Sequence, residues 1–238
     1  MRYALLLALI PLTACSGAWS NGTSPSGLGA TRSYAVDGFT AVDAMGPDDV
    51  DVRVGPAFSI RAEGDPKELD KLVIARNGDT LEIRRKSDSG FHWNTSNRGV
   101  KIFVTMPKIT AASATGSGDM GVDKVDGDSF KASVTGSGNL KLGTIKVQSA
   151  DLSIRGSGNL TASGTTNTAS LTVKGSGDMD AGGLSAASAE VDVMGSGNVT
   201  AAVHGPAKVD MMGSGDVTLS GGAQCTTSKL GSGDVSCS

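Results

Sequence analysis

The chain has 238 residues and a nearly balanced charge, with 21 Lys and Arg against 24 Asp and Glu and a net charge of −3. This balance argues against nucleic acid as a partner, because nucleic-acid-binding domains are usually strongly basic. Glycine is abundant, at 34 residues, whereas aromatic residues make up only 4% of the chain. So few rings argue against the core of a large globular enzyme and are typical of thin β-coils lined by small aliphatic side chains.

The N-terminus has the pattern of a bacterial lipoprotein signal. An apolar run from Ala4 to Leu12 follows Arg2, and Leu12-Thr13-Ala14-Cys15 matches a lipobox. We therefore expect a signal peptide at residues 1–14 and acyl chains on Cys15 that anchor the protein to a membrane. The alternative is an ordinary secretory peptide with a chance cysteine.

Residues 15–33 are mostly Ser, Gly, Ala, Thr and Asn, so we expect a flexible tether between the lipid and the folded domain. Ser16, rather than Asp, follows the cysteine, as in Gram-negative lipoproteins of the outer membrane. The predicted location is therefore the cell envelope, with the anchor in the outer membrane.

Residues 34–110 carry strand patterns without a repeated corner. Asn77-Gly78 between two apolar runs predicts a hairpin turn, and residues 66–72 are compatible with one short helical turn. We interpret this region as the irregular first coils and cap of a solenoid, since terminal repeats are usually atypical; the alternative is a separate small sandwich. The alternating runs are Val50, Val52 and Val54; Phe58, Ile60 and Ala62; Leu81 and Ile83; and Val100, Ile102, Val104 and Met106.

A polar, Gly-containing loop at residues 87–99 includes three ring-bearing side chains, Phe91, His92 and Trp93. Such side chains more often cover an open end of the core, which is the interpretation we favour. The alternative is a ligand loop, because flat aromatic faces can stack on a sugar ring or a protein partner.

From residue 111 to 238 the chain repeats one pattern: Gly-Ser-Gly, then Asp or Asn, then Met, Leu or Val. The steps between copies are 20, 20, 19, 20, 18 and 18 residues, which indicates a repeat architecture. The copies begin at Gly116, Gly136, Gly156, Gly175, Gly195, Gly213 and Gly231.

Each corner is flanked by residues that are apolar at every second position, which is typical of strands with one buried face. Leu152 and Ile154, for example, precede the corner at Gly156, and Leu160 and Ala162 follow it. One such unit cannot bury its apolar face alone, so the copies must stack. The sequence therefore predicts an all-β fold, a single-stranded right-handed parallel β-helix with about 20 residues per coil.

The Asp or Asn after each Gly-Ser-Gly forms a predicted vertical ladder, in which the side chains cap amides of the corners. Asp216 and Asp234 at its end place like charges one above the other, which makes them the candidate calcium ligands. Because the nine-residue calcium-roll motif is absent and Asn interrupts the charges, we favour capping and expect no metal and no cofactor. The ladder consists of Asp119, Asn139, Asn159, Asp178, Asn198, Asp216 and Asp234.

Two cysteines besides Cys15 lie in the last copy, six residues before and six residues after its first glycine. In an oxidising compartment Cys225 and Cys237 are expected to form a disulfide that closes the final coil. The alternative is a pair of buried free thiols.

One outward position changes character along the repeats. The residue before each corner is Thr or a basic residue in the earlier copies and then becomes Met194, Met212 and Leu230. Three neighbouring exposed apolar side chains predict an interface, either with another copy of the chain or with a folded-over tail.

With its seven Gly-Ser-Gly-Asp/Asn copies and the β-rich half that ends in the run from Val100 to Pro107, the chain resembles the putative auto-transporter adhesin head domain family, the GIN domain. The resemblance covers about residues 34–238. It implies a right-handed β-helix and an adhesin-like role, and it brings no catalytic residues.

We therefore expect a non-enzymatic envelope lipoprotein that acts as an adhesin or as a binding or structural module, with an envelope glycan, a protein or another copy of itself as partner. With only His92 and His204 in the chain, a Ser-His-Asp site or a zinc site is not expected. The alternative is a protein that binds or processes polysaccharide. We rank it lower, because Asp192 and Asp210 stack beside Glu190 and Lys208 without a second acidic cluster.

Overall fold

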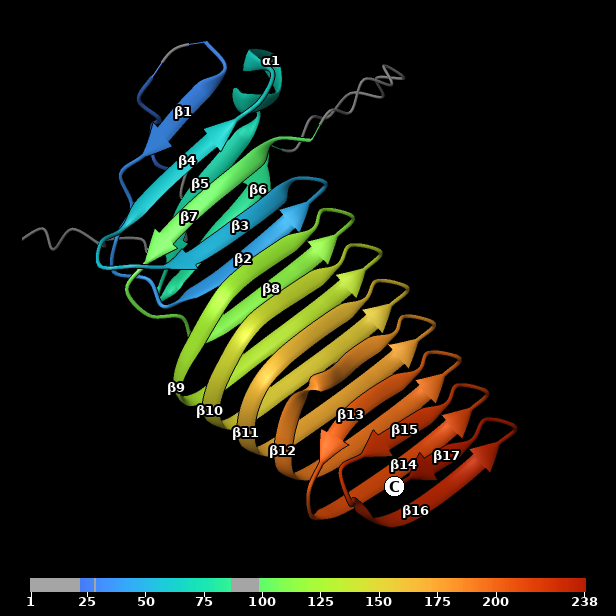
Figure 1. Cartoon of the computed structure of the whole chain (residues 1–238). Helices are drawn as coiled ribbons and strands as arrows, with labels where there is room; N and C mark the ends of the chain where they lie inside the picture. The colour runs from blue at the N-terminus through green and yellow to red at the C-terminus, as the bar shows by residue number, and fades with distance from the viewer. Residues whose placement is uncertain (1–21, 28, 87–98) are drawn as a thin grey trace, which may run out of the picture.

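The computed structural model describes residues 22–27, 29–86 and 99–238, and within them strands greatly predominate. The strands belong to one continuous 17-stranded sheet, coiled into a β-solenoid of about six turns with roughly 20 residues per turn (Figure 1). The β-helix predicted from the repeat is therefore confirmed.

The regular part of the column consists of long bent strands that stack in parallel. Each residue of one copy pairs with its equivalent in the next, so that Leu152 lies over Leu171 and Gly156 over Gly175. The strands are β8 (Ala111–Gly116), β9 (Met120–Gly136), β10 (Leu140–Gly156), β11 (Leu160–Gly175) and β12 (Met179–Gly195).

The last coils are shorter, and each has a second break besides its glycine corner, at residues 204–205 and 221–223, which divides it into two strands. β12 pairs in parallel with both β13 and β14, β13 with β15, β14 with β16, and β15 with β17. Their bounds are β13 (Val199–Val203), β14 (Pro206–Gly213), β15 (Val217–Ser220), β16 (Gln224–Gly231) and β17 (Val235–Cys237).

The corners require glycine because the backbones of successive coils nearly touch there. Gly136 has φ +117°, and a Cβ on it would lie 2.4 Å from the carbonyl oxygen of Gly116. The same oxygen accepts hydrogen bonds from the amides of Ser137 and Gly138, at 2.8 and 3.1 Å. A side chain at this glycine would therefore break the contact on which stacking depends.

The core is a single apolar column inside the coils. Alternating residues point inward, so that Leu152 and Ile154 stack with Leu171 and Val173 of the next coil, all fully buried. The outward residues between them are mostly Ser, Thr and charged side chains. This alternation buries one face of every strand and leaves the other in solvent.

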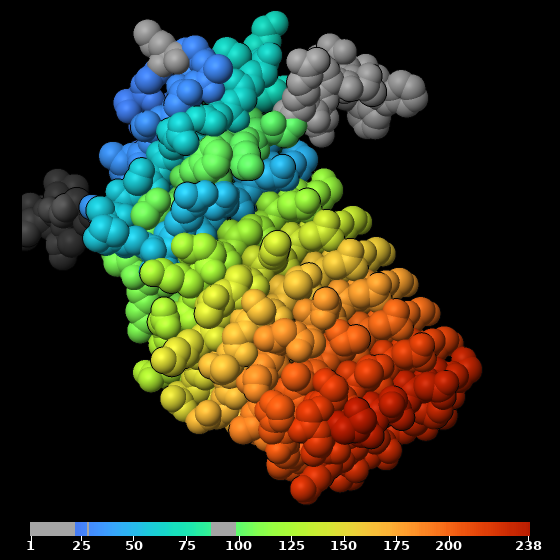
Figure 2. All heavy atoms as spheres, in the orientation of Figure 1, coloured from blue at the N-terminus to red at the C-terminus, as the bar shows by residue number. Residues whose placement is uncertain are grey.

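The first coil in space is formed by β2 (Ala41–Gly46) and β3 (Asp49–Val54). It pairs in parallel with β8 and β9, so that Gly46 is the partner of Gly116 and Val50 is the partner of Met120. On its opposite side it pairs with β6 and β7. The described residues between β3 and β8 therefore leave the column and cover its outer end, and the chain resumes the column with β8 on the other side of the first coil, as the colours in Figures 1 and 2 show.

This excursion and the preceding strand β1 together form a cap that contains antiparallel pairs. β4 pairs with β1 and β7, and β5 forms a hairpin with β6 through the turn at Gly78, which confirms the turn predicted at Asn77-Gly78. The short helix that the sequence indicates is present as α1. The elements are β1 (Thr31–Tyr34), β4 (Ser59–Glu63), α1 (Pro66–Leu69), β5 (Leu72–Asn77), β6 (Thr80–Arg85) and β7 (Lys101–Met106).

An ion pair between the buried Asp48 and the partly buried Arg85 joins the cap to the first corner. Asp48 occupies the position of the second corner glycine, and its carboxylate accepts hydrogen bonds from Arg85 Nη2 at 2.6 Å and from the Val100 amide at 2.8 Å. Arg85 also pairs with Glu68 of α1, and hydrogen bonding to Asp48 and Glu68 raises the pKa of the guanidinium. The first corner can carry a side chain because no glycine corner lies beyond it.

Candidate binding surface

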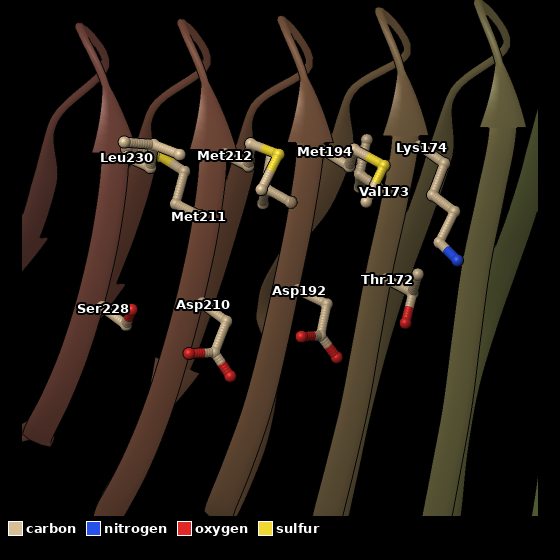
Figure 3. Close-up of a pocket in the computed structure, with 11 residues that line it drawn as sticks. Thr172, Val173, Lys174, Asp192, Met194, Asp210, Met211, Met212, Ser228 and Leu230 are labelled. Atoms are coloured by element: carbon tan, nitrogen blue, oxygen red, sulfur yellow. The ribbon is translucent and has the colours of Figure 1, made fainter.

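One face of the solenoid carries outward side chains in rows parallel to the long axis. These side chains come from the strand segments before each corner in β11, β12, β14 and β16, and parallel pairing brings equivalent positions together. Figure 3 shows two of the rows, one formed by Lys174, Met194, Met212 and Leu230 and the other by Thr172, Asp192, Asp210 and Ser228.

The apolar row consists of Met194, Met212 and Leu230, which are neighbours in the register. These side chains are 53%, 51% and 67% exposed, and no other large apolar side chain in the described ranges is exposed to this degree. In the preceding coils the same position holds Lys174 and Arg155. The row is therefore a local departure from a polar surface.

The acidic row consists of Asp192 and Asp210, two residues before the apolar row on the same strands. Between the two rows lies a shallow groove of about 560 Å³, whose floor includes the inward residues Val193 and Met211. The groove has an apolar side and an anionic side, and it extends over four coils, from β11 to β16.

Lysine 208 partly neutralises the acidic side. Its Nζ lies 2.5 Å from Asp210 Oδ2 and 3.2 Å from Glu190 Oε1, and hydrogen bonding to Asp210 and then to Glu190 raises the pKa of the Lys208 ammonium. Asp192 has no such partner: within the described part of the chain, no ion pair or hydrogen bond involves its carboxylate. It therefore remains an available anion in the groove.

The Asp/Asn ladder caps backbone amides. The Asn139 amide donates to Asp119 Oδ1 at 2.9 Å, and the Asp234 amide donates to Asp216 Oδ1 at 2.8 Å. Side-chain amides add a second bond where Asn follows Asp, as from Asn139 Nδ2 to Asp119 Oδ1 at 2.9 Å. Successive rungs are therefore joined by a hydrogen bond from the backbone amide of one rung to the side-chain oxygen of the rung before it. This is the amide capping that the sequence favours over calcium binding.

The ladder begins one coil earlier than the sequence reasoning placed it. The Asp119 amide donates to Asp49 Oδ1 at 3.1 Å, so Asp49 is the first rung. The signal was present in the sequence, since Gly46, Asp49 and Val50 have the repeat spacing, with Val42 and Ala44 before them. It was missed because Pro47 and Asp48 replace Ser-Gly and because the next copy lies 70 residues later.

At the C-terminal end of the described structure, the coil of β16 and β17 pairs on one side only, with β14 and β15. Cys225 and Cys237 are joined by a disulfide between β16 and β17, and both are partly exposed because nothing stacks on them. The inward positions that hold Val209 and Met211 in the previous coil hold Thr227 and Lys229 here. Lys229 Nζ donates to the Gly233 carbonyl oxygen at 2.6 Å, so polar groups close the column.

Several predicted residues lie outside the described residues: Cys15, the candidate lipidation site, and Phe91, His92 and Trp93 of the candidate ligand loop. Among the residues that the structure does describe, there is no group of three or more His, Cys, Asp or Glu arranged to hold a metal. The described ranges also contain no helix with the length and apolar character needed to cross a membrane.

The fold and this surface define a class of protein, a glycine-cornered β-solenoid with one amphipathic face. The chain belongs to the family described as putative auto-transporter adhesin, head GIN domain, whose model matches residues 38–223. The family resemblance seen in the sequence is thereby confirmed. No curated protein matches the chain significantly.

Solved structures share the fold over most of their length. A putative adhesin from Bacteroides fragilis superposes with a TM-score of 0.78 at 22% identity, covering 87% of this chain and 95% of that one. A putative lipid binding protein from Parabacteroides distasonis gives 0.69 at 24% identity, covering 87% and 96%. A putative adhesin from Parabacteroides merdae gives 0.68 at 17% identity, covering 87% and 95%. At these identities the likeness shows a common fold.

Proposed function

We propose that this protein is a non-enzymatic lipoprotein of the cell envelope, held through Cys15 in the outer membrane of a Gram-negative bacterium, and that its solenoid acts as an adhesive binding surface. Membership of a family of putative adhesins supports an envelope or surface location. The lipobox sequence supports the anchor.

The observation that carries the binding function is the apolar row beside the groove. Three exposed apolar side chains at neighbouring register positions are uncommon on a solvated polar surface and mark interaction sites. Folding does not require them, because Lys174 and Arg155 occupy the equivalent outward position in earlier coils. Their role is therefore expected in contact with a partner.

The polysaccharide alternative receives less support from the same groove. Sugar-binding surfaces commonly present flat aromatic faces, and among the described residues no aromatic side chain lines this groove. Apart from Lys174 at one end, its charged and large apolar lining consists of Asp, Met, Leu and Val, which favours contact with apolar and cationic groups of a protein.

Adhesion by bacteria that carry the full chain tests the proposal. Cells with Met194→Ser, Met212→Ser and Leu230→Ser are expected to lose most attachment to immobilised envelope extract and to one another. A matched control, Met194→Leu, Met212→Leu and Leu230→Met, keeps the row apolar and is expected to attach like wild type. Equal attachment by the serine variant at equal surface amounts would contradict the binding role of this face.

The anchor has its own test. Cys15→Ser is expected to abolish incorporation of a fatty-acid label and to release the protein from the outer-membrane fraction. Retention of label or of membrane association by this variant would overturn the lipoprotein assignment and would leave the binding test unaffected.

A further inference from the structure

The groove carries uncompensated negative charge on one side only. On the acidic side the carboxylates of Glu190, Asp192 and Asp210 accompany one ammonium, that of Lys208, which pairs with Glu190 and Asp210. The other lysine that lines the groove, Lys174, lies at the β11 end of the opposite row. The acidic side of the groove is therefore net anionic, and Asp192 lacks a cation. A partner that places cationic groups on this side gains electrostatic complementarity.

The opposite side of the groove is built from adaptable apolar side chains. Met194 and Met212 are unbranched and polarizable, so they adjust to irregular apolar partners. Together with Leu230 they form a continuous strip across three coils (Figure 3). Such a strip suits a row of aliphatic or aromatic side chains presented by a polypeptide.

The axial repeat of the strip distinguishes a helix from a strand. Neighbouring coils are spaced by about 4.8 Å, as paired strands are. Along an α-helix, the apolar residues of one face recur every three or four positions, on average about 5.4 Å apart along its axis, so they drift from the coils by only about 0.6 Å at each step. In an extended strand, same-face residues recur about 6.7 Å apart and so drift by nearly half a coil at each step. A helix parallel to the solenoid axis therefore matches the strip.

We propose that this groove binds an amphipathic α-helix of a protein partner, lying along the solenoid axis with its apolar stripe on Met194, Met212 and Leu230 and with Lys or Arg residues on one flank facing Asp192 and Asp210. This inference rests on the proposed function, since it names the partner of the same surface. The helix-in-groove mode explains why apolar and acidic rows run side by side over the same coils.

A labelled peptide of about 15 residues, with Leu at helical spacing and Lys at the other positions, is the probe. Its binding to the full chain carrying Cys15→Ser is measured by fluorescence anisotropy, and its helicity by circular dichroism against the all-β background. Two control peptides are a Leu/Lys peptide of the same composition with strict alternation and a helical peptide with Glu in place of Lys. We expect binding with gain of helicity for the first peptide and at least tenfold weaker binding for both controls.

Variants of the protein locate the site. Met194→Ser, Met212→Ser and Leu230→Ser are expected to weaken binding about 100-fold, because three buried apolar contacts are lost. Asp192→Asn with Asp210→Asn is expected to weaken it about 2- to 10-fold and to reduce its salt dependence. The matched control, Asp126→Asn with Asp128→Asn, removes the same charge from β9, outside the groove, and is expected to leave binding unchanged.

Two sets of results overturn the inference. In the first, the alternating or Glu peptide binds as well as the helical Lys peptide. In the second, the helical Lys peptide does not bind, or binds the serine variant equally. If adhesion of cells still depends on the apolar row in either case, the proposed function stands and only the helical partner is wrong. If adhesion does not depend on the row, the binding function itself fails.

Discussion

The two ends of the solenoid cover the exposed end of the core in different ways. Any stack of coils exposes an apolar core and unpaired strand edges at its ends. At the N-terminal end, the strands of the cap pair with the first coil, and the Asp48–Arg85 ion pair joins them at the corner. At the C-terminal end, the described strands β16 and β17 pair on one side only; Thr227 and Lys229 replace apolar residues, and the Cys225–Cys237 disulfide closes the coil.

The difference shows that the N-terminal cap shares the buried core of the coils, whereas the C-terminal coil packs on the end of that core and stays largely exposed. The cap buries Leu69, Ile74 and Leu81 as part of the same core as the coils. The last coil keeps its strands largely exposed. It is held by the parallel pairing of β16 with β14 and of β17 with β15, and the disulfide joins its own two strands. Damage to the first end is therefore expected to reduce global stability, whereas damage to the second is expected to remain local.

The largest effect is expected from Asp48→Ala, which removes the acceptor of the buried Val100 amide and leaves the partly buried Arg85 guanidinium with Glu68 alone. The expected loss is about 2–4 kcal/mol, measurable as a lower urea midpoint. The control is Asp151→Ala, which breaks an exposed pair with Lys131 and is expected to cost about 1 kcal/mol or less. Equal losses in the two variants would show that the cap is not integrated with the column.

Removal of the disulfide tests the other end. Cys225→Ser with Cys237→Ser opens a link between residues separated by 12 positions, and the expected loss is about 2–3 kcal/mol for the last coil. Amide hydrogen exchange is expected to accelerate in β16 and β17 and to stay unchanged in β2 and β9. Uniform acceleration throughout the solenoid would contradict the local character of this end.

The Asp/Asn ladder allows the same comparison between a rung inside the column and the last rung. Asp119→Ala removes the acceptor of two hydrogen bonds from Asn139, and we expect a loss of about 1–2 kcal/mol. Asp234→Ala removes the final rung, whose carboxylate is 91% exposed and has no coil beyond it, and is expected to change stability by less than about 0.5 kcal/mol. Chemical denaturation of both variants compares the rungs directly, and equal losses would refute the stacking role of the ladder.

The smallest effect is expected from acid. Hydrogen bonds from Lys71 and Arg85 lower the pKa of Glu68 from its ordinary value of 4.5. Its contribution is therefore present above about pH 4.5 and is lost as the pH falls through the lowered pKa. Burial raises the pKa of Asp43, which acts in the opposite direction, so the test compares wild type with Glu68→Gln. The variant is expected to show a shallower loss of stability between pH 5 and about 3; an identical slope would exclude this contribution.

Much of the candidate surface follows from counting positions in the sequence. Met194, Met212 and Leu230 share one offset from the corner, so equal copies in register must place them in one row. The pairing of Lys208 with Asp210 is different, because it depends on how a long side chain turns on the surface. The groove between the rows likewise depends on the curvature of the sheet, which a count of positions does not contain.

The sequence by itself determined the coil, its length, its glycine corners and the faces of its strands, because these depend on a period of two and a repeat of about 20 residues. Only the tertiary structure decided which coil stands first and what covers it. Gly46 pairs with Gly116 across 70 positions, and Asp48 meets Arg85 across 37. Contacts at such separations arise from competition among alternative strand pairings, and local patterns of hydrophobicity do not settle that competition.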